Sequence, residues 1–467
     1  MRRRAFLTSA AAGLAGLAGC LGGNGNDGAD GTPTERATDG PLADPTPTGT
    51  PPPSATPTPG PGLTTTPPAT GESPRPTDPP ETGTPTPTDP PADRDVPTAT
   101  GEPAAPERVE SAWPLPAADA GYTNGTTASG PTEPVAELWS ADAGGPVSAP
   151  VVADGRLYVG RHDGTVLAVD ARDGSERWRR SVGDGAGVPR AVGDRLYVPT
   201  PGALVALARG DGSETWRVDA TDRADVVGPD GRFLRPALLV SESGVYSVAG
   251  EEPPAVVARS LADGSERWRT DIATPWDLPI FAGEDRIFVS SGTRDSRFWR
   301  LDADSGDRLG KAPRPGHDFP AEQCYANGTV YAVDAFFGSV HATAVAEAGH
   351  GWSAGVNPGG SGAGLLSYGG DRVYYTSNSE DGPNLYAFHG DGGTGWSRDL
   401  TPEIVGRPVV AGETVVVPTD AGLRAFDPAD GSDLWLRPGD ATGERVVVAD
   451  DLVFATSGRA VRAFRAP

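Results

Sequence analysis

Residues 154–180, DGRLYVGRHDGTVLAVDARDGSERWRR, contain the pattern that predicts the fold. Apolar and polar residues alternate in two short runs, 156–160 and 165–170, on either side of the turn sequence His162-Asp163-Gly164. Alternation of this kind, bounded by Asp-Gly turns, is typical of antiparallel β-hairpins. A second turn at residues 171–174 leads to a third predicted strand, which we expect to end at Trp178.

The same phrase recurs along the chain, so the hairpin is part of a repeat. Each copy ends at a tryptophan, or at a glycine in one degenerate copy, and these landmark positions are Trp139, Trp178, Trp216, Trp268, Gly310, Trp352, Trp396 and Trp435. Successive landmarks are 39, 38, 52, 42, 42, 44 and 39 residues apart. About four strands per copy at this spacing is typical of β-propeller blades. We therefore predict an all-β fold, an eight-bladed β-propeller.

The two ends of the repeat region are incomplete in complementary ways. No strands precede Trp139, and the last copy, residues 444–465, has no tryptophan-bearing strand after it. We predict that the N-terminal strand pairs with the last blade, because this pairing closes the ring and removes its exposed edges.

The repeat has the form Ala-x-Asp-x-x-(Asp)-Gly-x-x-x-Trp in residues 168–178 and 425–435. It resembles the repeat of quinoprotein alcohol dehydrogenases and of their non-catalytic relatives, the PQQ-like propellers of the outer-membrane assembly lipoprotein type. The resemblance covers about residues 113–467. In that family the tryptophan packs between neighbouring blades, so the resemblance implies an architecture and not an activity.

The catalytic members of that family imply a cofactor site that this sequence lacks. The site needs an adjacent Cys-Cys disulfide, acidic and Asn ligands for calcium, and a catalytic Asp, whereas Cys20 and Cys324 are the only cysteines. We expect Cys324 to be a small buried residue. The five histidines show no metal-ligand spacing. We therefore predict no catalytic residues, no cofactor and no metal site.

Acidic residues recur at one turn of the repeat and could suggest calcium. We expect them to cap their turns through their own side chains. The residues concerned are Asp173, Asp211, Asp263, Asp304 and Asp430.

The formal net charge is −24, and Lys311 is the only lysine. A surface of this charge has no basic stripe for phosphates, which argues against nucleic acid as a partner. The acidic, lysine-poor composition resembles that of proteins from extremely halophilic archaea.

The N-terminal region resembles an exported lipoprotein. Arg3 and Arg4 match the twin-arginine export motif, a short apolar stretch follows, and residues 17–20 resemble a lipobox in which Cys20 would carry the lipid. We predict a signal at residues 1–19, a disordered Pro/Thr-rich linker at 20–112 and the propeller at 113–467. This organisation predicts a lipid anchor in the cell membrane, with the domain on the extracytoplasmic face.

Two further features bear on surface contacts. Asn124 and Asn327 begin sequences that match the N-glycosylation acceptor pattern. Aromatic and histidine side chains in predicted loops form a candidate partner surface, with the alternative that they fill the mouth of the ring or pack between blades. These residues are Trp276, His317, Phe319, Phe336 and Phe337.

From the sequence we predict a monomeric binding or assembly scaffold for envelope or surface proteins of unknown identity. One alternative is a quinone-dependent dehydrogenase with an atypical site. Another is a carbohydrate-binding module at the cell surface.

Overall fold

The computed structural model describes residues 96–219, 238–249, 255–272, 280–283, 285–290, 297–313, 320–334, 339–345, 351–355, 364–379, 382–400, 403–439 and 445–467. All regular elements in these ranges are β-strands. None of the described segments is a helix with the length and hydropathy of a membrane span. Chain contacts divide the protein into residues 1–71 and 72–467, and every strand belongs to the second unit.

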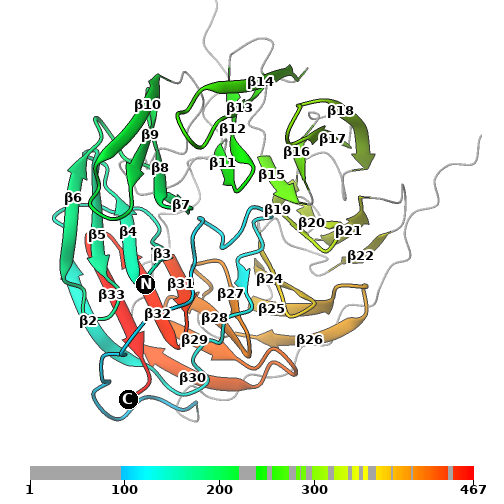
Figure 1. Ribbon diagram of the computed structural model, residues 1–467. Helices are drawn as coiled ribbons and strands as arrows, with labels where there is room; N and C mark the ends of the chain where they lie inside the picture. The colour runs from blue at the N-terminus through cyan, green and yellow to red at the C-terminus, as the bar shows by residue number, and fades with distance from the viewer. Residues whose placement is uncertain are drawn as a thin grey trace, which may run out of the picture. The chain divides into compact units, whose positions relative to one another are not determined.

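The strands form eight sheets, the blades of a β-propeller (Figure 1). Blade 1 contains β3 (Val151–Ala153), β4 (Arg156–Gly160), β5 (Thr165–Asp170) and β6 (Glu176–Ser181). Blade 2 contains β7 (Arg190–Val192), β8 (Arg195–Thr200), β9 (Ala203–Ala208) and β10 (Glu214–Asp219). Blade 3 contains β11 (Leu238–Ser241), β12 (Gly244–Ala249), β13 (Ala255–Arg259) and β14 (Glu266–Asp271). Blade 4 contains β15 (Ile280–Gly283), β16 (Arg286–Ser290), β17 (Arg297–Asp302) and β18 (Arg308–Pro313).

Blade 5 contains β19 (Pro320–Ala326), β20 (Thr329–Asp334), β21 (Ser339–Ala344) and β22 (Gly351–Gly355). Blade 6 contains β23 (Leu365–Gly369), β24 (Arg372–Ser379), β25 (Gly382–His389) and β26 (Thr394–Asp399). Blade 7 contains β27 (Val409–Ala411), β28 (Thr414–Thr419), β29 (Gly422–Phe426) and β30 (Asp433–Pro438). The short β1 (Gly125–Thr126) adds a fifth strand to its inner edge. Blade 8 contains β31 (Arg445–Ala449), β32 (Leu452–Ser457), β33 (Ala460–Arg465) and β2 (Ala136–Asp142).

The structure confirms the eight predicted blades and their closure. In blade 8 the sheet order is β2-β33-β32-β31, so the first long strand of the domain completes the last blade. Trp139 on β2 lies opposite Ala463 on β33. The predicted hairpin strands of blade 1 are β4 and β5 with the same bounds, but its outer strand continues past Trp178 to Ser181.

The landmark residues occupy equivalent positions in the strand register. Each tryptophan lies on the outer strand of its blade, opposite a small residue of the third strand, and all but Trp352 lie beside a register shift: Ala168↔Trp178, Ala206↔Trp216, Ala258↔Trp268, Ala342↔Trp352, Ala387↔Trp396 and Ala425↔Trp435. Blade 4 differs, because Gly310 lies opposite Arg300.

Antiparallel order within each blade places its connections at two ends of the ring. Turns between the first and second strands and between the third and fourth strands lie at one end, which we call the turn end; in blade 1 these are residues 154–155 and 171–175. The other connections lie at the opposite end, which we call the loop end. All five residues of the candidate partner surface lie outside the described residues.

Candidate functional site

Neighbouring blades are joined by the landmark tryptophans. The Trp178 indole of blade 1 donates a hydrogen bond to the Arg209 carbonyl in the turn of blade 2, over 3.0 Å. Gly212 of that turn has φ +72, and a Cβ atom there would lie 2.6 Å from the Trp178 ring. Only glycine meets both conditions without strain. The repeated glycine and the repeated tryptophan are therefore two halves of one contact.

The same indole bond recurs at six more joints around the ring. The donors and acceptors are Trp139 to Ala171, Trp216 to Leu261, Trp268 to Ala303, Trp352 to Gly390, Trp396 to Pro428 and Trp435 to Pro131.

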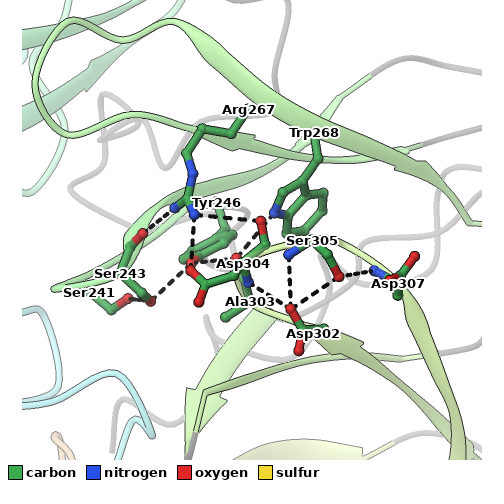
Figure 2. A network of polar contacts seen from close by, with 10 residues as sticks. All are labelled: Ser241, Ser243, Tyr246, Arg267, Trp268, Asp302, Ala303, Asp304, Ser305 and Asp307. Atoms are coloured by element: carbon green, nitrogen blue, oxygen red, sulfur yellow. Dashed lines mark hydrogen bonds and ion pairs between the residues drawn. The ribbon is translucent and has the colours of Figure 1, made fainter.

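Figure 2 shows the joint between blades 3 and 4. The Ala303 carbonyl accepts hydrogen bonds from the Trp268 indole at 3.1 Å and from the Tyr246 hydroxyl at 3.0 Å. An exposed ion pair between Arg267 and Asp304, at 2.9 Å, spans the same two blades. The Asp302 carboxylate accepts hydrogen bonds from the following backbone amides and holds the receiving turn in shape.

Four of the five predicted turn-capping acids accept a hydrogen bond from the amide of the serine two residues later: Asp173, Asp211, Asp263 and Asp430. The prediction is wrong for Asp304, which pairs with Arg267. Ser305 occupies the capping position in that blade, where its hydroxyl accepts a hydrogen bond from the Asp307 amide. Asp391, which the prediction missed, caps the turn of blade 6. Ser305 and Asp391 each stand directly before the turn glycine, so choosing that position in every copy would have identified both.

The joint between blades 4 and 5 uses an arginine in place of the tryptophan. The Arg300 guanidinium donates 3.2 Å hydrogen bonds to the Val345 carbonyl of blade 5 and to the Leu309 carbonyl of its own blade. A Cβ atom at its cross-strand partner Gly310 would lie 3.5 Å from the guanidinium, an ordinary contact, so glycine is favoured there by its φ of +105 and not by crowding. The large and small residues have exchanged strands, and the donor to the next blade is retained.

A segment before β2 runs through the middle of the ring and contacts every blade (Figure 1). We call residues 110–126 the belt. In six blades one equivalent backbone amide of the inner strand donates to a belt carbonyl, over 2.7–3.1 Å. The pairs are Val152 to Trp113, Ala191 to Pro114, Ala282 to Ala120, Tyr325 to Gly121, Tyr368 to Thr123 and Val410 to Asn124. In these six sheets the belt thus satisfies a donor that the inner edge would otherwise leave unpaired.

The two remaining blades contact the belt through side chains. In blade 8 the Asp450 carboxylate accepts hydrogen bonds from the amides of Glu110 at 2.7 Å and Ser111 at 3.2 Å. In blade 3 the Leu238 carbonyl accepts the Tyr122 hydroxyl at 3.3 Å.

The chain on either side of the belt also packs on the ring. The Pro131 carbonyl accepts the indole of the fully buried Trp435 at 2.8 Å, in the place that a turn of the next blade takes elsewhere. The Pro97 carbonyl accepts the amide of Leu436 on an outer strand. Residues 96–112, which the sequence assigns to the linker, therefore include contacts with the propeller.

Charged groups near the inner strands are paired. Glu322 on β19 forms an ion pair with Arg407, the two side chains being about one-quarter exposed. Burial raises the pKa of Asp119 in the belt, although its carboxylate accepts the hydroxyl and amide of Thr123. Cys324 is buried as expected, and burial raises the pKa of its thiol.

The two candidate glycosylation residues have different surroundings. The Asn124 side chain is buried in the belt, where its amide donates to the Pro408 carbonyl. Asn327 is exposed at the turn end of blade 5, with its amide donating to the Tyr368 hydroxyl at 3.0 Å. Arg3, Arg4 and Cys20 lie outside the described residues.

A quinone cofactor with calcium does not fit the residues present. The whole sequence has no adjacent cysteines. Within the described ranges, no three His, Cys, Asp or Glu side chains gather as a metal site. Two acidic side chains, Glu322 of the inner strand β19 and Asp119 of the belt, are engaged by Arg407 and Thr123.

The sequence matches the family described as outer membrane protein assembly factor BamB over residues 131–309 and 326–466. The fold is similar to BamB from Moraxella catarrhalis, with a TM-score of 0.53 and 16% identity over 71% of this chain and 97% of that one. It is similar to quinohemoprotein alcohol dehydrogenase from Comamonas testosteroni, with a TM-score of 0.56 and 14% identity over 76% and 82% of the chains.

A europium-containing methanol dehydrogenase gives a TM-score of 0.55 at 12% identity, over 76% of this chain and 98% of that one. At these identities the structures establish the fold and not an activity. None of the curated protein sequences matches this chain.

Proposed function

The chain belongs to the family described as outer membrane protein assembly factor BamB, and from this premise we propose that it is a non-catalytic scaffold that binds proteins of the cell envelope. The family match, over two long stretches that span the blades, is the observation that carries the proposal. The fold adds a reason: eight joined blades present their connections at two ends of one framework, on which loops can form a contact surface.

The second candidate is a quinone-dependent dehydrogenase, which the similar fold of the quinohemoprotein enzyme favours. The donor set described above argues against it. Protein incubated with PQQ and calcium should show neither bound-quinone absorbance nor dye-linked oxidation of alcohols or sugars. Saturable quinone absorbance together with turnover would establish the dehydrogenase instead.

The partner surface that we propose lies at the loop end and includes Phe336 and Phe337. Interface energy usually concentrates in a few aromatic anchors, with truncation costing about 2 kcal/mol each. The double variant Phe336→Ala/Phe337→Ala should keep the parent's melting temperature and lose its partner in pull-downs from envelope fractions. The matched control is Leu309→Ala, which truncates a 44% exposed side chain on the outer strand β18.

A folded double variant that captures the same partner as the parent would remove this surface from the proposal. A double variant that melts lower but binds normally per folded molecule would show that the two rings are packed inside the domain. Retention of the parent on polysaccharide would favour the carbohydrate-binding alternative.

We also propose that Cys20 anchors the protein in the membrane by a lipid and that residues 20–95 act as a spacer. The lipobox-like sequence and the paired Arg3 and Arg4 support this. Cys20→Ser should release the exported protein from membranes without changing its melting temperature. An exported, cleaved Cys20→Ser protein that stays membrane-bound would contradict the anchor.

A further inference from the structure

The path of the N-terminal chain points to a mechanical role for the belt. We propose that residues 110–126 keep tension on the N-terminal linker away from β2, the strand that closes the ring. The inference rests on the proposed tether for its biological use, but the contacts that carry it are those of the folded domain.

The order of contacts along the chain is the first argument. Tension applied before residue 96 meets, in turn, the contact of Pro97 with blade 7, the clamp of Ser111 on Asp450, and the belt contacts with the inner strands. The Pro131 contacts with Trp435 and Thr414 come next. Only then does the chain enter β2 at Ala136. The belt therefore stands in series between the linker and the closing strand.

The geometry of the closing strand is the second argument. β2 and β33 pair antiparallel, and the first pair on the N-terminal side is Ala136↔Arg465. Tension that reached Ala136 directly would open this ladder from its end, one residue pair at a time. Such a ladder resists poorly, because each step breaks only one or two hydrogen bonds.

The belt spreads the same tension over the ring. Its carbonyls bind six equivalent inner-strand amides, each in a different blade. Trp113 is fully buried, and Leu115 is 7% exposed, so detaching the first part of the belt also exposes apolar surface. The Trp113 backbone forms two bonds with Val152, at 2.8 and 2.9 Å, so its attachment to blade 1 combines two hydrogen bonds with a buried ring.

The belt can be weakened without touching β2. Gly121 lies so close to blade 5 that a Cβ atom would be 2.2 Å from the Tyr325 carbonyl oxygen. Gly121→Val should therefore push the belt off blade 5, and Trp113→Ala should remove its main apolar anchor. Gly202→Val is the matched control, since nothing lies within 4 Å of a Cβ atom at this turn of blade 2.

The experiment is constant-force spectroscopy on the full chain in unlipidated form, held at the Cys20 thiol and at the thiol of a Gly210→Cys variant, an exposed turn position of blade 2 where nothing lies within 4 Å of a Cβ atom. In the parent, β2 should detach only after the belt. Trp113→Ala and Gly121→Val should each speed the detachment of the belt from the inner strands roughly tenfold, as expected for the loss of about one buried hydrogen bond with its packing. Gly202→Val should leave that rate unchanged.

A parent that releases β2 in its first event, or belt variants that detach at the parent's rate, would overturn the proposal. If both belt variants fail to fold, Ser111→Ala removes the hydroxyl that accepts a hydrogen bond from the Asp450 amide and should still speed the release of this clamp. Hydrogen exchange without force gives a second readout: the amides of Ala191 and Ala282 should be protected in the parent, and fast exchange there would also overturn the proposal. None of these measurements depends on lipid or partner, so they can fail separately from the proposed function.

Discussion

The joint between blades 1 and 2 and the joint between blades 4 and 5 solve one packing problem in two ways. In the first, Trp178 reaches across to blade 2 from the outer strand, opposite the small Ala168. In the second, Arg300 reaches across to blade 5 from the third strand, opposite the small Gly310. What the two joints share is a donor to a backbone carbonyl of the next blade. A joint therefore requires a donor and a filled volume, and the residue type and strand can change.

Removing the donor side chain of each joint should have the largest effect on stability. Trp178→Ala deletes a large side chain that is 9% exposed and should lower the free energy of unfolding by about 3–5 kcal/mol. Arg300→Ala should cost less, about 1–3 kcal/mol, because it loses hydrogen bonds of a charged group and less apolar packing. Denaturant melts of both variants check this order. An Arg300→Ala loss equal to that of Trp178→Ala would show that the arginine is as important as the indole.

The glycines of the two joints, Gly212 and Gly310, should also respond differently to substitution. Gly212 and Gly310 both have positive φ, so alanine at either position should cost about 1 kcal/mol from the backbone alone. Gly212→Ala should cost about 2 kcal/mol more, since its Cβ would press on the Trp178 ring. Thermal melts of the pair measure the difference. Equal losses would mean that the ring shifts freely and that contact with the glycine does not set the joint.

The turn that accepts the Trp139 indole contains a carboxylate whose contribution to stability depends on pH. Burial alone would raise the pKa of Asp170, but hydrogen bonds from Arg172 and Arg177 outweigh it and hold that pKa well below its usual range. A carboxylate with a lowered pKa stabilises the fold above its unfolded pKa of about 3.9, and this contribution disappears as pH falls toward the folded pKa.

Asp170→Asn should therefore be less stable than the parent near about pH 7, and the gap should narrow below about pH 4. Melting temperatures across this range provide the measurement. A gap that stays constant with pH would assign the effect to the shape of the turn and not to its charge.

The smallest effect is expected at the ion pair in Figure 2. Asp304 is 80% exposed and pairs with Arg267 beside the Trp268 joint. Exposed pairs contribute about 0–1 kcal/mol, so Asp304→Ala should leave the melting temperature nearly unchanged. A loss above that range would mean that the pair helps to position the indole bond.

The repeat made the joints predictable from sequence. The recurring phrase identified the landmarks, including Gly310 in its degenerate copy, and their even spacing indicated the blades. The exchange of donor at Arg300 was not predictable, since Arg300 belongs to the pattern of no other copy. Asp304 was misassigned by one residue because an aspartate stood next to the position that Ser305 occupies.

The belt shows more clearly which features could not be predicted from the sequence. Residues 110–126 have no apolar alternation, and only Trp113 suggested that folded structure begins there. Asn124 looked like a surface residue because it begins an acceptor sequence, yet its side chain is buried against Pro408. Neither the path of the belt nor the burial of Asn124 leaves a local sequence pattern, because the partners of these residues are backbone groups from several blades.

By itself, the sequence determined the all-β class, the number of blades and the closure of the ring through β2. The class and the number of blades follow from local alternation, turn residues and a regular spacing, which act within about 40 residues of chain. The closure follows from the complementary gaps in the first and last copies. Only the tertiary structure decided which residues would fill the centre of the ring, which donor would join blades 4 and 5, and which carbonyl would accept the Trp435 indole. Those choices depend on backbone groups that lie far apart in the sequence and meet only when eight blades surround one axis.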